Sequence, residues 1–140
     1  MNRTAKIMLR MVPMVITMGA IFFLSHQTGD QLSLPPIPGI DKLGHMAVYG
    51  ILAGTILFAF SENQKSTNPR SVMLFTVAFC ILYGISDEIH QSFIPGRFVS
   101  IYDVFADGAG ASVACALWIW LRTKGFFINL VGVFFAKWQS

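Results

Sequence analysis

The sequence predicts an all-α integral membrane protein, a bundle of four transmembrane helices forming one domain over residues 1–140. Two observations support this fold class. Of the 140 residues, 54% are hydrophobic and only 12% are charged, more apolar surface than a soluble domain of this size could bury. The apolar residues also fall into four runs of about 20 residues each, the length that crosses a bilayer as a helix.

The first span is expected over residues 7–25. It follows a basic start, a pattern also typical of a signal peptide. Residues 24–27 offer no small-x-small cleavage site and three more apolar runs follow, so we predict a retained helix. Pro13 is expected near the start of this helix, where a missing N–H is tolerated.

Polar segments separate the three later spans, expected over residues 41–60, 71–90 and 101–121. Prolines break the first connecting loop, the second is a short polar loop over residues 61–70, and the third turns at Pro95-Gly96-Arg97. The apolar part of the tail is too short to span a membrane. Its aromatic residues predict an interfacial helix over 125–138, with a packed or re-entrant segment as the alternative.

Small residues follow one another in the fourth span, as GAGAS over residues 108–112. They predict a close approach between helices and not a phosphate-binding loop, because no strand precedes them. Cys80 and Cys115 lie inside apolar runs without metal-ligand spacing. We expect both to be buried free thiols.

The basic residues predict the orientation. Four spans place eight of them on one side: Arg3, Lys6, Arg10, Lys65, Arg70, Arg122, Lys124 and Lys137. The other side receives Lys42 and Arg97. Both termini are therefore expected in the cytoplasm, and six of the seven acidic residues are expected on or near the outer side.

Polar stripes occur where three spans reach that outer side. Asp87, His90 and Gln91 are spaced i, i+3, i+4, and Asp103 and Asp107 are spaced i, i+4, so each set shares a helix face. A third stripe follows the start of the second span: Asp41, His45 and Tyr49. Buried charge at a membrane position indicates a functional site, and a shared outward-facing pocket explains why the three levels match.

Each residue also has a purely structural interpretation. Asp41 is a candidate N-cap, and Asp103 could belong to a capping arrangement after Ser100. A lone histidine such as His45 is more often a satisfied buried side chain than a ligand. Tyr49 fits an interface aromatic, and Arg97 fits a solvated loop charge.

Three segments resemble the signatures of the VanZ-like membrane proteins: DKLGHMAVYG, YGISDEIHQSFIPGR and SIYDVFADGAGA. FFLSHQTG also fits, so the resemblance covers residues 21–121. It implies a small helical protein of the bacterial cytoplasmic membrane. Through the namesake it implies a link to resistance against glycopeptide antibiotics of the teicoplanin type, although it supplies no biochemical activity.

Three functions remain open at this stage. In an enzyme, Asp87, Glu88, His90 and Asp107 would be catalytic, and a divalent metal ion at Asp87, His90 and Asp107 is one option. The expected substrate-binding residues are Lys42, His45, Tyr49, Gln91, Arg97 and Asp103. In a binding module the same pocket would hold its ligand unchanged. A proton-coupled transporter fits least, because the cytoplasmic halves of the spans lack polar residues.

The expected partners follow from the position and charge of the pocket. Lys42 and Arg97 suit an anionic headgroup. We therefore expect membrane lipids and an anionic lipid-linked envelope precursor as partners, and no nucleic acid. Ion pairing among the same residues would look identical in sequence, so enzyme and binder are not separated here.

Overall fold

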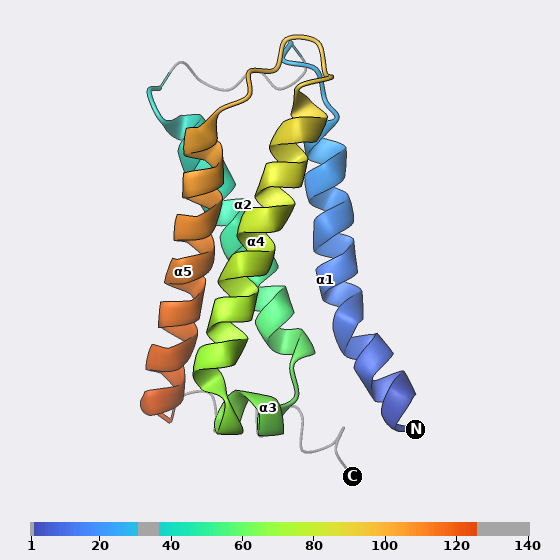
Figure 1. Ribbon diagram of the computed structural model, residues 1–140, viewed down its shortest axis with the longest axis vertical. Coiled ribbons are helices and arrows are strands. Elements are labelled where there is room, and N and C mark those ends of the chain that lie inside the picture. Colours follow the sequence, from blue (N-terminus) through green and yellow to red (C-terminus); the bar gives the residue numbers. More distant parts are fainter. Residues whose placement is uncertain (1, 31–36, 126–140) are drawn as a thin grey trace.

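The computed structural model describes residues 2–30 and 37–125, which form five helices (Figure 1). They are α1 (Arg3–Ser25), α2 (Ile40–Ala59), α3 (Glu62–Thr67), α4 (Pro69–Gln91) and α5 (Ile101–Thr123). All except α3 are long and apolar enough to cross a membrane. This confirms the all-α, four-span prediction. The expected interfacial helix lies almost entirely outside the described residues.

The four long helices alternate in direction (Figure 1). The ends of α1 and α4 and the starts of α2 and α5 therefore lie at one end of the bundle, the upper end in Figure 1. α3 lies at the opposite end, with the start of α1 and the end of α5. This alternation gathers the three polar stripes at a single level.

The expected loop over residues 61–70 is wrong in part, because it contains α3. Ser61 caps this helix, accepting a hydrogen bond from the Gln64 N–H, and the Gln64 side chain accepts one from the Ser61 N–H. This reciprocal pair satisfies two backbone donors that would otherwise have no partner at the helix start. Pro69 then opens α4, where its fixed φ suits the first helical turn.

Pro13 corrects a second expectation. α1 begins at Arg3, so Pro13 lies inside the helix and not near its start. A proline there removes one intrahelical hydrogen bond, and the Thr17 hydroxyl donates to the Pro13 carbonyl at 2.9 Å. Toward its N-terminus α1 leans away from the other helices (Figure 1), and apolar side chains there, such as Met8, are exposed.

The closest helix contact joins α2 and α5. A Cβ added at Gly110 would lie 2.8 Å from the Met46 carbonyl carbon and overlap its oxygen. Gly50 lies against the Gly110 carbonyl from the α2 side. The predicted role of residues 108–112 in helix packing is therefore observed, since only glycine permits this backbone approach.

The core below this contact is apolar. It is built by fully buried side chains that include Leu52, Ala53, Ile56, Cys80 and Cys115. Both cysteines are free thiols, as predicted. The buried Thr76 hydroxyl donates to the Val72 carbonyl within α4, so it adds no unsatisfied group.

Candidate functional site

The start of α2 brings the first two polar residues into the site. The helix is capped by Gly39, whose φ of 80° is the left-handed region that glycine adopts easily. Asp41 lies in the first turn, so its interpretation as the N-cap is wrong. Lys42 donates to Asp41 at 2.8 Å and also forms an ion pair with Asp103 of α5. Lys42 thus links the starts of two helices.

One turn further along α2, His45 meets the second carboxylate of α5. Its Nδ1 lies 2.9 Å from Oδ1 of Asp107, whose side chain is fully buried. Its Nε2 lies 4.0 Å from Oδ2 of Asp103. The two nitrogens of His45 therefore face two different carboxylates.

Gly84 of α4 makes room for Asp107. A Cβ at Gly84 would overlap the Asp107 carboxylate and lie 3.2 Å from its Cγ. The other oxygen of Asp107, Oδ2, is buried with no hydrogen-bond partner among the described residues. Asp107 is thus held between a glycine on one side and His45 on the other.

Glu88 reaches the same group from the end of α4. Its Oε2 accepts a hydrogen bond from the Ser100 N–H at 2.7 Å, which ties α4 to the start of α5. Its Oε1 is buried with no hydrogen-bond partner among the described residues, and the residue is 4% exposed. Ser100 makes no side-chain cap at α5, so the capping alternative proposed for Asp103 is not observed.

Asp87 and Gln91 form a second, connected group. The Gln91 amide donates to Asp87 at 2.9 Å and to the Ser25 hydroxyl of α1 at 3.3 Å. All three residues are buried. Ser25 was not among the predicted site residues, although its place at the end of the first span puts it at the same level.

His90 lies apart from this group. Its Nε2 is 3.3 Å from Nδ1 of His26, and its ring is 4.6 Å from the ring of Phe22 on α1. Among the described residues, His90 belongs to no group of side chains that could bind a metal ion. The expected metal ligands Asp87, His90 and Asp107 do not form such a group. The structure places His90 at the α1–α4 contact instead.

A cavity of about 260 Å³ adjoins the polar residues. Its polar lining consists of Ser25, Asp41, His45, Tyr49, Asp87, Gln91 and Arg97. Side chains from α1 and α2, among them Ile21, Leu24 and Val48, form an apolar wall. The cavity surface is therefore mainly apolar, with ionisable residues among its lining.

Tyr49 and Arg97 both line this cavity. The Tyr49 hydroxyl is buried without a hydrogen-bond partner among the described residues, so Tyr49 is not an exposed interface aromatic. Arg97 follows Gly96 in the turn after α4, and Gly29 holds this turn by donating to the Pro95 carbonyl at 3.2 Å. No described acidic residue lies within ion-pair distance of Arg97.

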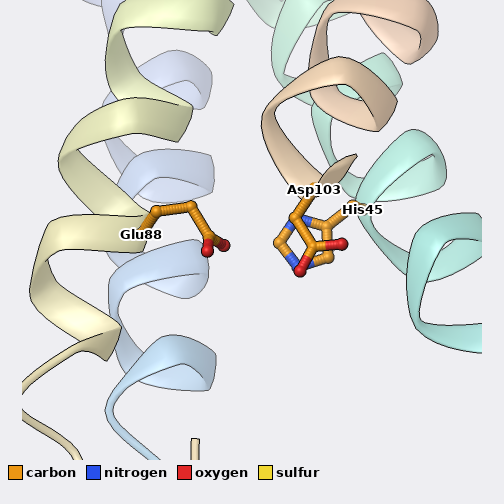
Figure 2. A group of neighbouring side chains, drawn as sticks. All are labelled: His45, Glu88 and Asp103. Carbon is orange, nitrogen blue, oxygen red and sulfur yellow. The ribbon is translucent and has the colours of Figure 1, made fainter. Parts of the chain in front are cut away.

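Three ligand-type side chains come closest together: His45, Glu88 and Asp103. One ligand atom from each lies within 4.8 Å of the others. Figure 2 shows Glu88 extending from α4 toward Asp103 of α5 and His45 of α2. Each residue comes from a different helix, so their meeting depends on the packing of all three.

Acidic groups outnumber cations here. Asp87, Glu88, Asp103 and Asp107 are all buried, and Asp41 lies beside them. The nearby permanent cations are Lys42 and Arg97. Buried carboxylates repel one another unless a proton or a cation relieves them, so this group of acids needs a compensating positive charge.

Four spanning helices around a buried acidic site define a multi-pass helical membrane protein. A protein-family profile described as VanZ/LLP1 matches residues 3–122, and the chain belongs to this family. The match confirms the resemblance seen in the sequence. No curated protein and no solved structure matches the chain.

Proposed function

We propose that this VanZ-family protein binds an anionic, lipid-linked molecule of the cell envelope at the cavity beside His45 and Arg97. One observation carries the proposal. The cavity has an apolar wall from α1 and α2 and is also lined by charged residues, among them Arg97, which has no described acidic partner within ion-pair distance. Such a combination suits a ligand with a hydrocarbon part and a charged headgroup.

Arg97 is the residue we propose for the headgroup. A guanidinium pairs with phosphate or carboxylate through two parallel hydrogen bonds, which an ammonium group cannot copy. The glycine turn that carries Arg97 is tied to the segment after α1 by the Gly29–Pro95 backbone hydrogen bond. An arginine on a turn held in this way loses less conformational freedom on binding than one on a free loop.

The site also supports a second candidate, catalysis on the bound headgroup. The His45–Asp107 pair has the arrangement of an oriented imidazole, since the carboxylate fixes one nitrogen and leaves the other to exchange a proton. In this version His45 would be the general base or acid, with Asp107 as its positioning residue. Turnover of the bound lipid would distinguish this candidate from binding alone.

Transport is disfavoured by the lower half of the bundle. Apart from Thr76 and Lys65, the buried side chains described below the level of Asp107 are apolar, and Lys65 belongs to α3 at the far end. A conduction path needs polar groups along its whole length. The polar residues instead form a pocket at one end.

We assign the outer side of the bacterial cytoplasmic membrane to the end that carries the site. The described basic residues Lys65, Arg70, Arg122 and Lys124 lie at the opposite end, in or near α3 and the end of α5. Their excess supports a cytoplasmic position for that end. Glycopeptide antibiotics act on envelope precursors at the outer face, so this orientation is compatible with the resistance link suggested by the family.

The test is binding of undecaprenyl phosphate to the detergent-purified protein, measured by isothermal titration calorimetry. We expect the lipid to bind wild type and Arg97→Lys to weaken binding about tenfold or more, because a bidentate contact is lost. Arg122→Lys is the matched control, since Arg122 pairs with Glu62 at the other end of the bundle. Undecaprenol, which lacks the phosphate, should bind weakly. Equal affinities of wild type and Arg97→Ala would refute the proposal.

A further inference from the structure

The geometry points to a divalent transition-metal site formed by His45, Glu88 and Asp103, with Asp107 as the residue that orients His45. This inference goes beyond the proposed function and stands without it, because it concerns an ion and not the occupant of the cavity. The three ligand residues come from α2, α4 and α5 and meet where these helices approach at the acidic end.

His45 supplies the first argument. With the Nδ1–H donating to Asp107 at 2.9 Å, Nε2 carries a lone pair and no proton. Nε2 and Oδ2 of Asp103 are 4.0 Å apart, too far for a hydrogen bond. Metal–ligand distances are about 2.1 Å for imidazole and carboxylate, so an ion fits between these two atoms.

Glu88 supplies an independent argument. Its Oε2 is occupied by the Ser100 N–H, whereas Oε1 is buried and has no described hydrogen-bond partner. The carboxylate points toward Asp103 and His45 in Figure 2. A buried, unpartnered carboxylate oxygen is costly, and a bound cation removes that cost.

The surroundings of the three ligands match those of known metal sites. Asp107 is the carboxylate partner that ligating histidines usually have, which fixes the ring and its tautomer. Lys42 pairs with Oδ1 of Asp103 and leaves Oδ2 facing His45. The Lys42 charge opposes a cation, but the acidic residues around the site outnumber Lys42 and Arg97.

The ligand set selects the kind of metal. One imidazole and two carboxylates suit Zn²⁺ or Mn²⁺, whereas Ca²⁺ takes six or more oxygens and Mg²⁺ keeps most of its water. The ligand atoms of the three residues lie within 4.8 Å of one another. Two ligand atoms of a tetrahedral ion lie about 3.4 Å apart. Binding should therefore draw the ligands together and make the three helices more resistant to unfolding.

The experiment titrates the full-length, chelator-stripped protein in detergent with Zn²⁺, Mn²⁺ or Mg²⁺ alone, measured by calorimetry. We expect one Zn²⁺ or Mn²⁺ per chain and much weaker binding of Mg²⁺. Glu88→Gln keeps an acceptor for the Ser100 N–H and should weaken binding at least about 100-fold, and Asp107→Asn should weaken it about 10- to 100-fold. Glu62→Gln at the opposite end of the bundle is the control and should bind as wild type does.

A spectroscopic measurement separates ligation from a structural effect. Electron spin echo modulation of bound Mn²⁺ should show one directly bonded imidazole nitrogen, absent in His45→Gln. The inference is overturned if folded wild type binds neither Zn²⁺ nor Mn²⁺, or if Glu88→Gln binds as tightly as wild type. The first outcome would mean that protons neutralise the acids, and the second would mean that the metal binds without Glu88. Undecaprenyl phosphate binding, measured separately, would be unaffected by that result.

Discussion

Replacing Gly110 by alanine should open the α2–α5 contact that supports the site. The added Cβ would lie 2.8 Å from both the carbonyl carbon and the Cα of Met46, and it would overlap the carbonyl oxygen. Ordinary contacts begin near 3.4 Å. The helices must therefore separate by at least about 0.6 Å, and neither partner can rotate away because both are backbone.

The expected cost is about 2–3 kcal/mol of unfolding free energy, the upper part of the range for overpacking a close-packed core. Alanine is the better helix former, by about 1 kcal/mol in water, so the measured net loss should be somewhat smaller. The assay is unfolding by sodium dodecyl sulfate in dodecyl maltoside micelles, followed through Trp118 and Trp120. Met46 adjoins His45, so metal binding should weaken together with stability.

Gly54 of α2 is the matched control for this prediction. A Cβ there meets nothing within 4 Å, so Gly54→Ala should leave stability unchanged or slightly increase it. If Gly110→Ala unfolded at the same detergent composition as Gly54→Ala, the close α2–α5 contact would be refuted. If both lost stability equally, alanine itself and not the contact would be responsible.

Two further predictions concern regions away from the site. Burial raises the pKa of Glu62, but the hydrogen bonds and charges of Lys65 and Arg122 outweigh burial and lower the pKa below 4.5. The ion pairs of Glu62 therefore stabilise the fold above that pH. This stabilisation is lost as the pH falls through the lowered pKa. Because Glu62 is largely exposed, acid titration of the wild type should show a loss of unfolding free energy under about 1 kcal/mol, and Glu62→Gln should not show this loss. If Glu62→Gln had the same acid profile as the wild type, the result would count against the ion pairs. Cys80 and Cys115, both at most 1% exposed, should resist a maleimide in the folded protein and react after unfolding; rapid labelling would contradict their burial.

The spans could be predicted because membrane helices need long apolar runs, and all four runs lie in helices that are long enough to cross. Their alternation also placed Asp41, Asp87 and Asp103 at one end. α3 was missed because its six residues are polar and were interpreted as a loop. The Ser61–Gln64 capping box was the signal that could have revealed it.

Helix spacing alone could not decide which edge of the polar stripe on α4 faces the site. Successive residues are rotated by about 100°, so Glu88 and Gln91 lie to one side of Asp87 and His90 lies about 60° to the other. α4 contacts both α1 and α5, and these edges therefore meet different partners. Glu88 bonds to Ser100 at the start of α5, whereas His90 packs on Phe22 of α1. That choice depends on tertiary packing, which the spacing does not contain.

The position of the acids within their helices explains how a membrane bundle can hold them. Asp41 and Asp103 lie in the first turns of α2 and α5, where the exposed N–H groups and the helix dipole stabilise negative charge. Asp107 is one turn deeper, beyond most of that effect, and its observed partner is His45. The site therefore places its least compensated carboxylates, Glu88 and Asp107, next to the imidazole that could share a metal ion or a proton with them. The rigid glycine contact below keeps this group assembled.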